Sequence, residues 1–138
     1  MPSAYLAHNF AARFWLLTKV FPKFLEAEIV VTSTWITVLK EHDITLEALK
    51  KHALQDINDI LAADYFIYFA DQFGPIPGRG KFVELGFALN SGVGNIIVVT
   101  EDIEARAKEC AFLALALPTV KTVDEAIGLI KKRQENER

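Results

Sequence analysis

The sequence predicts an α/β fold in which five parallel strands alternate with helices that cover both faces of the sheet. Apolar runs rich in β-branched and aromatic residues, such as residues 65–70 and 96–99, have the length of strands that are buried on both faces. Segments with apolar residues at three- and four-residue steps, such as residues 46–60, separate these runs and are typical of amphipathic helices. This alternation favours a parallel sheet, and ligands of such sheets bind beyond the carboxyl ends of the strands.

The first part of the chain contains two expected strands, residues 4–7 and 28–32, with a helix between them. Large apolar residues recur on this helix at three- and four-residue steps, and we expect the stripe to face the core: Phe10, Phe14, Leu17, Phe21 and Leu25. Three apolar residues fall off the stripe and are expected to contact another element or a second subunit: Trp15, Leu16 and Val20. Pro22 is expected to kink the helix or to shift its boundary.

The connection over residues 33–43 is expected to pack three apolar side chains inward: Trp35, Ile36 and Val38. Thr45 then caps a long helix that runs to about Ala63. The apolar stripe of this helix consists of Leu46, Leu49, Ala53, Ile57 and Ile60. By this pattern Asp59 points to solvent, whereas Asp56 lies at the edge of the stripe and is either a solvated residue or a site residue. Asp64 is expected to cap or end structure before the next strand.

The second part of the chain is expected to contain three strands and three helices. The buried strand over residues 65–70 ends at a glycine- and proline-rich loop, and a helix begins near Phe82. The remaining expected elements are a strand at 96–99, a short helix at 102–109, a strand at 112–116 that Pro118 ends, and a final helix. Thr122 and Glu125 have the spacing of a capping box at the start of that final helix.

Length and composition fit one domain over residues 1–138. Hydrophobic residues make up 51% of the chain, and this apolar character, with the off-stripe residues of the first helix, predicts a homodimer or a dimer of dimers. The net charge is −3, and Lys and Arg do not cluster with interleaved aromatics, so a polymeric nucleic acid is not an expected partner. Cys110 is the single cysteine, and no apolar run reaches about 18 residues. Together with a start that lacks a signal-peptide pattern, this predicts a cytoplasmic protein that does not associate with membranes.

Glu84 is the first candidate for chemistry. If the helix opens near Phe82, Glu84 lies in its first turn, where free N–H groups and the helix dipole favour an ionised carboxylate that can act as a nucleophile or bind a hydroxyl. Gly86, one turn after Phe82, is expected to permit close packing against the sheet. The alternative is that Glu84 only stabilises its helix, by roughly 0.3–1 kcal/mol.

Several common motifs are absent from the sequence. The loop over residues 74–81 has Pro75 where a Walker A motif needs its first glycine, and Phe82 replaces the Ser or Thr of that motif. A dinucleotide fingerprint fails because Val83 stands where its third glycine belongs. The histidines occur singly and are expected to be exposed or locally bonded: His8, His42 and His52. No metal site and no cofactor are predicted.

Three features together resemble the nucleoside 2-deoxyribosyltransferase family, including its deoxynucleoside-monophosphate N-glycosidase branch. The first strand reads Tyr5-Leu6-Ala7, Asp56 precedes Asp64 by eight residues, and residues 78–89 contain Glu84-Leu85-Gly86. The resemblance covers most of the chain and implies a flavodoxin- or Rossmann-like three-layer sandwich. It also implies that Glu84 attacks the anomeric carbon of the sugar, Asp56 assists at the nucleobase or orients the site, and Tyr5 helps to place the sugar. Retaining glycosyl chemistry needs two such carboxyl groups close together.

The chain departs from this family at its substrate-binding positions. Relatives carry Ser for a phosphate or Asp for a nucleoside where this chain has Gly78, and a small residue where it has His8 and Asn9. Backbone N–H groups of the loop, Arg79 or Lys81 are the expected substitutes at the first position, and the alternative is that both cations are solvated. The candidate substrate-binding residues are therefore His8, Asn9, Gly78, Arg79, Gly80 and Lys81.

The sequence thus predicts an N-glycosyl enzyme that cleaves or transfers the deoxyribosyl group of a 2′-deoxynucleoside or its 5′-monophosphate through a covalent intermediate on Glu84. Its partner is a small nucleoside or nucleotide, with a slight preference for the monophosphate. One alternative is a non-catalytic nucleotide-binding module that has kept the fold. Another is a purely structural interaction domain, because a fold does not fix a function.

Overall fold

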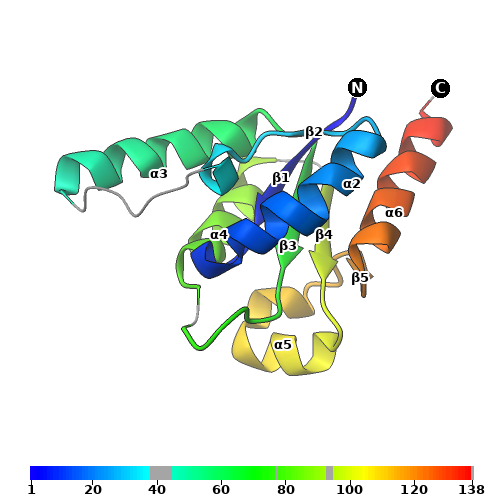
Figure 1. The fold of residues 1–138 in the computed structure, drawn as a ribbon. Helices are drawn as coiled ribbons and strands as arrows, with labels where there is room; N and C mark the ends of the chain where they lie inside the picture. Colours follow the sequence, from blue (N-terminus) through cyan, green and yellow to red (C-terminus); the bar gives the residue numbers. More distant parts are fainter. Residues whose placement is uncertain (38–44, 77, 93–94, 138) are drawn as a thin grey trace.

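The computed structural model describes residues 1–37, 45–76, 78–92 and 95–137, and their strands form one five-stranded sheet in which every neighbouring pair is parallel. The strand order is β2-β1-β3-β4-β5 (Figure 1). The strands are β1 Ser3–Ala7, β2 Val30–Val31, β3 Tyr65–Phe69, β4 Asn95–Val99 and β5 Thr119–Val120. This order is that of flavodoxin-like folds, and the chain direction across the sheet reverses between β1 and β3.

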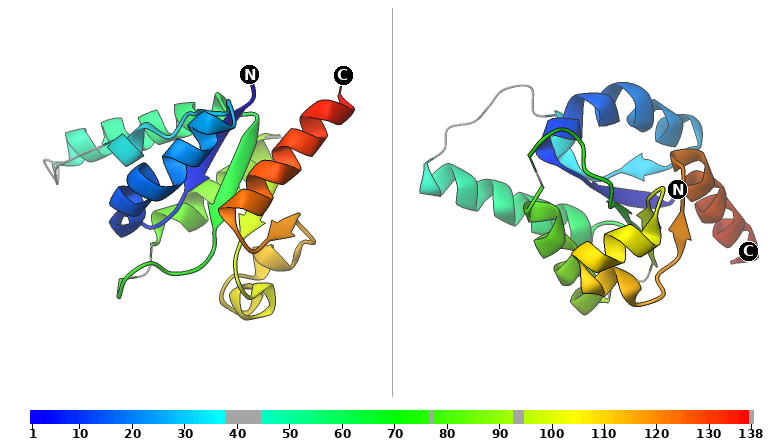
Figure 2. Two further views of the ribbon diagram at one scale, coloured as in Figure 1. Left: turned by 45° about the vertical axis from the view of Figure 1, so that its right-hand side comes forward. Right: turned by 90° about the horizontal axis from the view of Figure 1, so that it is seen from below.

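Helices cover both faces of the sheet (Figure 2). One face is covered by α1 Arg13–Trp15, the π-helical turn η2 Leu16–Val20, α2 Phe21–Glu26 and α6 Val123–Asn136. The other face is covered by α3 Leu46–Leu61, α4 Gly80–Ser91 and α5 Ile103–Glu109. Strands β1, β3 and β4 are buried between these two layers, as the near-continuous apolar runs predict. The predicted three-layer α/β class is confirmed.

The first helical segment buries a different face from the one that the sequence pattern predicts. Its buried residues recur at four-residue steps: Ala12, Leu16, Val20 and Phe24. Phe14 is 73% exposed and Leu25 is 57% exposed, so the predicted stripe is wrong. The reason is the π turn Leu16–Val20, which has more residues per turn than an α-helix and keeps residues four apart on one face. It lies just before Pro22 at the start of α2, so the expected shift of a helix boundary near Pro22 is confirmed.

Helix α3 is attached to the rest of the molecule through its last turn. Thr45 caps it as predicted, by accepting a hydrogen bond from the backbone N–H of Ala48 at 3.2 Å. Of its sixteen residues only Asp59 and Ile60 are buried. The other members of the predicted core stripe are exposed, with Leu46 at 86%, and the helix extends beyond the sheet (Figure 1). The amphipathic pattern therefore marks a surface that none of the described residues covers.

The connection before α3 packs inward as expected, because Ile36 is 1% exposed and Trp35 contacts both apolar layers. Val38 and His42 lie outside the described residues. Asp64 joins the starts of two strands, since its Oδ2 accepts hydrogen bonds from the backbone N–H of Ser3 at 3.0 Å and from the Ser3 hydroxyl at 3.2 Å. This agrees with its expected role at the end of the α3 segment.

The expected strand at residues 112–116 is wrong. This segment contains the 3₁₀ turn η4 Ala111–Ala114, and Ala116 has a positive φ of 58°. Short apolar runs do not distinguish strand from helix, and this one lacks the β-branched residues that favour a strand. The last strand is instead β5, which follows Pro118. The cap of α6 is as predicted, because the Thr122 hydroxyl accepts from the Glu125 backbone N–H at 3.1 Å.

The revised buried face of the first helical segment can be tested by denaturation. Leu16→Ala should lower the free energy of unfolding by about 2–4 kcal/mol, because the side chain is fully buried. Leu25→Ala removes a side chain of the same size from an exposed position and should cost less than about 1 kcal/mol. Urea unfolding followed by circular dichroism would measure both, and equal losses would contradict the assigned face.

Candidate active site

Tyr5 and Glu84 meet between strand β1 and helix α4. Tyr5 is fully buried on β1, and its ring stacks on that of Phe66 of the neighbouring strand with 5.7 Å between centroids. Its hydroxyl donates a hydrogen bond to Oε2 of Glu84. The phenol therefore holds the carboxyl group at the sheet face beside the β1/β3 reversal point, where ligands of such folds bind.

Glu84 does not lie in the first turn of its helix. Helix α4 begins at Gly80, so Glu84 is in the second turn, beyond the short reach of the helix N-terminus. Burial raises the pKa of the Glu84 carboxyl to about 7, the Asp56 charge acts in the same direction, and the hydrogen bond from Tyr5 opposes both. The expectation that helix position keeps Glu84 ionised is thus wrong, and the carboxyl titrates near neutral pH. Gly86 is exposed, and an added Cβ there would contact nothing within 4 Å, so its expected packing role is also wrong.

Asp56 is the second carboxyl group near this pair. It lies on α3 and is half-buried. Its pKa is raised to about 6, chiefly by burial and also by the negative charge of Asp59, while His52 acts in the opposite direction. Its charge influences both Tyr5 and Glu84. The hydrogen bond between Tyr5 and Glu84 thus joins two of the three candidate catalytic residues, and the charge of Asp56 acts on both of them.

Gly78 is required by the close approach of Asn9. A Cβ at residue 78 would lie 2.9 Å from Cγ of Asn9 and 3.0 Å from its Cα. Asn9 is 2% exposed, and its Nδ2 donates to the carbonyl oxygen of Ile76 at 2.9 Å. Its Oδ1 has no hydrogen-bond partner among the described residues. The amide of Asn9 thus occupies the space next to residue 78 and anchors the loop after β3.

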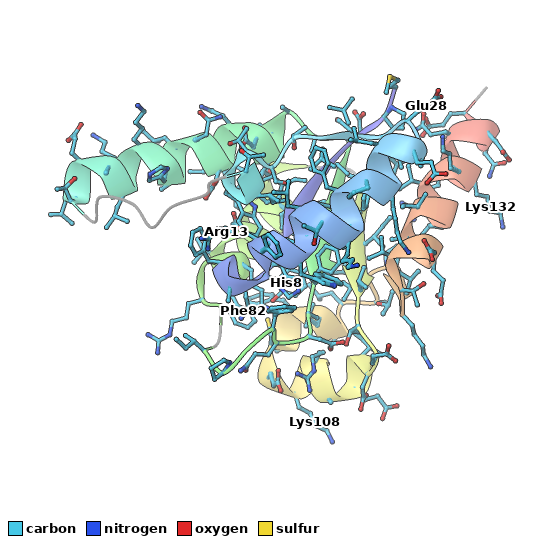
Figure 3. All side chains as sticks on the ribbon, in the orientation of Figure 1. His8, Arg13, Glu28, Phe82, Lys108 and Lys132 are labelled. Atoms are coloured by element: carbon cyan, nitrogen blue, oxygen red, sulfur yellow. The ribbon has the colours of Figure 1, made fainter. Side chains whose placement is uncertain are left out.

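His8 is neutral at pH 7. Its ring stacks on Phe69 with 5.1 Å between centroids, and Nδ1 accepts a hydrogen bond from the backbone N–H of Asn9 at 2.8 Å. Burial lowers its pKa to about 4, and the positive charge of Lys81 acts in the same direction. Because Nδ1 is an acceptor, the ring proton is on Nε2. Figure 3 shows His8 and Phe82 toward the same end of the molecule, where β1 and β3 finish.

The two cations of the loop differ in their surroundings. Lys81 is 4% exposed, and its Nζ donates to the carbonyl oxygens of Phe69 at 2.9 Å and Ala70 at 3.4 Å. Burial lowers its pKa to about 8, so it is still mainly protonated at pH 7. The alternative of a solvated side chain is therefore wrong for Lys81. Arg79 and Gly80 are exposed at the start of α4.

Ser33 and Trp35 of the connection after β2, and Asp59 of α3, also lie near this edge and were not among the predicted site residues. The Ser33 hydroxyl accepts from the backbone N–H of Leu6 at 2.7 Å, and Nε1 of Trp35 donates to the Leu6 carbonyl oxygen at 3.0 Å. Asp59, expected in solvent, is 7% exposed, because its carboxylate accepts hydrogen bonds from Thr34 and Gln55. The available signal was polar residues directly after a strand, at the edge where ligands bind.

Three further observations concern metal ions, membrane spans and a groove. Within residues 1–37, 45–76, 78–92 and 95–137, no three His, Cys, Asp or Glu side chains are grouped so that they could hold a metal ion. None of the helices in the same ranges is both long and apolar enough to cross a membrane. A groove of about 540 Å³ lies at the amino ends of the strands, lined in part by Met1, Asp64 and Asn95. It is at the opposite end of the sheet from Asn9 and the loop after β3.

The fold has a counterpart among solved structures. The crystal structure of a conserved protein from Enterococcus faecalis V583 superimposes with a TM-score of 0.70 at 16% sequence identity, over 96% of this chain and 99% of that chain. At this identity the similarity establishes the fold and nothing further. A comparison with known protein families gave no match. A comparison with curated proteins also gave none.

The raised pKa of Glu84 predicts a stability change with pH. Between its ordinary value of 4.5 and about 7, the folded chain keeps a proton that the unfolded chain has lost, so the stability contributed by the protonated form falls as the pH rises through this range. Glu84→Gln removes the ionisation and should raise the free energy of unfolding by about 1–2 kcal/mol at pH 8 relative to wild type, with little change at pH 4.

Unfolding by urea at both pH values would measure this effect. Glu135→Gln, at an exposed position on α6, is the matched control and should not show the pH-dependent gain. The same stability difference for Glu84→Gln at pH 4 and pH 8 would contradict a buried carboxyl group that titrates near neutrality.

Proposed function

We propose that this protein is an N-glycosyl enzyme that cleaves or transfers the deoxyribosyl group of a 2′-deoxynucleoside or its 5′-monophosphate. The observation that carries the proposal is the Tyr5 to Glu84 hydrogen bond beside Asp56, at the β1/β3 reversal point. The sequence resemblance to nucleoside 2-deoxyribosyltransferases supports the same three residues. A cytoplasmic location is part of the proposal and follows from the single cysteine.

In the proposed reaction the ionised Glu84 carboxylate attacks C1′ of the sugar, and the bond between C1′ and the base nitrogen breaks. Asp56 in its protonated form gives its proton to the departing base. Water or a second base then attacks C1′ of the resulting ester and gives its proton to the Asp56 carboxylate, while the bond between C1′ and Glu84 breaks and restores the Glu84 carboxylate. Tyr5 orients Glu84 and stabilises its charged form, because the hydroxyl donates to the carboxylate.

The two carboxyl groups set the pH dependence of this reaction. Glu84 must be ionised, and its pKa near 7 makes the rate rise with pH up to that value. Asp56 must be protonated, and its pKa near 6 makes the rate fall above that value. The product of the two requirements is a bell-shaped profile with its maximum between about pH 6 and 7, in which the reactive pair is a minor protonation state.

The choice between nucleoside and monophosphate depends on the loop after β3. The sequence favoured a phosphate held by backbone N–H groups, Arg79 and Lys81. Since the Lys81 ammonium already donates to the carbonyl oxygens of Phe69 and Ala70, the phosphate would depend mainly on Arg79 and on the free N–H groups at the start of α4. We therefore propose the monophosphate as a substrate on the basis of Arg79 and these N–H groups.

A survey of deoxynucleosides and their 5′-monophosphates would test the function, with binding and free-base release both measured. Wild type should release base with a pH optimum between about 6 and 7, and Glu84→Gln should lower the rate by at least about 10³-fold while remaining folded. Arg79→Ala should raise KM for the monophosphate more than for the nucleoside. Binding without cleavage would instead favour a non-catalytic nucleotide-binding module, and neither binding nor cleavage would favour an interaction domain.

We also propose that the chain forms a homodimer or a dimer of dimers through α3. Its exposed apolar side chains share the part of the helix that extends from the body: Leu46, Leu49, Leu54 and Ile57. Contiguous apolar surface of this kind is typical of subunit interfaces. The sequence pattern suggested Trp15 for contact with a second subunit, but its ring packs against Phe69 and Phe73 of the same chain. A partner's helix over α3 would also lie close to Asp56.

Light scattering at micromolar concentration should show a dimer or tetramer. Leu49→Glu should shift the protein toward monomer, because it places a charge within the apolar surface. Thr18→Glu, at an exposed position on the first helical segment, is the control and should leave the assembly unchanged. A wild-type monomer would exclude α3 as a stable homomeric interface.

A further inference from the structure

Asp59 forms a buried polar junction between α3 and the turn η3 Thr34–Thr37. Its Oδ2 accepts hydrogen bonds from the Thr34 backbone N–H at 3.0 Å and from the Thr34 hydroxyl at 2.6 Å. Its Oδ1 accepts from Nε2 of Gln55 at 2.9 Å. In addition, its backbone carbonyl accepts from the Thr32 hydroxyl at 2.8 Å. The carboxylate thus accepts three hydrogen bonds, all from neutral donors. Within the described residues it forms no ion pair.

This junction determines where Asp56 lies. Only Asp59 and Ile60 of α3 are buried, so the helix is oriented by its last turn, and Asp56 lies one turn before Asp59 on the same side of the helix. The other half of the junction is itself fixed, because Trp35 of η3 donates to the carbonyl oxygen of Leu6 on β1. A continuous set of contacts therefore runs from the strand that carries Tyr5 to the helix that carries Asp56.

The junction also places a negative charge next to Asp56. Among the residues that the structure describes, the charges of Asp59 and His52 on the same helix act on Asp56, and the charge of Asp56 acts on Tyr5 of β1 and Glu84 of α4. Asp59 favours the protonated form of Asp56, and His52 opposes it. Since a general acid must carry a proton, the Asp59 charge acts in the direction that the departing base requires.

We propose that Asp59 is a positioning residue for the N-glycosyl reaction: its hydrogen bonds to Thr34 fix the last turn of α3, and its carboxylate then lies one helical turn from Asp56 and fixes the surroundings of that carboxyl group. This inference rests on the proposed function for its catalytic meaning. Its physical content is a carboxylate that orients a neighbouring carboxyl group and favours the protonated form of that group, and this content is independent of the substrate.

The test compares three variants that separate charge from geometry. Asp59→Asn removes the charge and keeps the shape. Because Asp56 has the lower pKa of the reacting pair, its titration sets the low-pH break of the kcat/KM profile, and this variant should move that break downward by about 0.5–1 pH unit and lower the maximum about 3–10-fold. Thr34→Val removes one donor and keeps the charge, and it should lower kcat about 3–10-fold without moving that break. Asp64→Asn is the control, because this aspartate at the same end of α3 binds Ser3 instead, and it should leave the break in place.

The titration of Asp56 itself gives a readout that does not need activity. The ¹³Cγ resonance of Asp56, assigned by its loss in Asp56→Asn, should titrate at lower pH in Asp59→Asn than in wild type, whereas Thr34→Val should leave it nearly unchanged. If wild type releases no base, the proposed function fails while this titration still decides the inference. An Asp56 titration that is identical in wild type and folded Asp59→Asn would overturn the proposal, and so would an unchanged pH profile in an active enzyme. Should Asp59→Asn fail to fold, a Thr34→Val variant with wild-type kcat would overturn the positioning role.

Discussion

The hydrogen bond from Tyr5 to Glu84 is the interaction on which the site depends. It joins the central strand β1 to helix α4. Tyr5 is fully buried in the apolar layer between the sheet and its helices, and Glu84 is half-buried. A buried phenol hydroxyl without a partner would be destabilising, because it could not hydrogen-bond to water. The Glu84 carboxyl group satisfies this hydroxyl, and the packing of α4 on the sheet then fixes the direction of the carboxyl group.

The carboxyl edge of the sheet also collects ionisable groups in surroundings that do not favour their charges. Glu84 and Asp56 have raised pKa values, and Lys81 is buried against the carbonyl oxygens that end β3. Apolar residues at these positions would serve folding better, since buried charged groups without an ion-pair partner reduce stability. Their grouping at one edge is typical of a functional site, where local rules of folding are broken for the sake of chemistry.

The sequence predicted those features that follow from short, strong patterns. The strands Tyr65–Phe69 and Asn95–Val99 were recognised because their apolar runs are long and rich in β-branched and aromatic residues, and the caps at Thr45 and Thr122 because capping depends on nearby residues. Burial on the helices was predicted less well. The face of the first helix depended on a π turn that periodicity does not reveal, and on α3 an apolar stripe showed an amphipathic helix without showing which surface covers it.

The site shows the same division. The sequence proposed Tyr5, Asp56 and Glu84 as candidate catalytic residues, but the surroundings that set their properties come from residues distant in the chain. Asp59 was assigned to solvent because the helix pattern contains no information about Thr34, which is 25 residues away.

Gly78 gives the clearest instance of this dependence on distant residues. From the sequence, Gly78 was interpreted as the loss of a substrate-binding side chain. In the structure, the Asn9 amide fills the space that a side chain at residue 78 would need. Asn9 in turn holds the Ile76 carbonyl, so the two positions fix the loop after β3 against the end of β1. The loop leads directly into α4, and its anchoring therefore supports the same helix that carries Glu84. A side chain at residue 78 is opposed by both parts of Asn9, because its Cβ would lie 2.9 Å from the side-chain Cγ and 3.0 Å from the backbone Cα; a change of residue 9 removes only the first of these contacts.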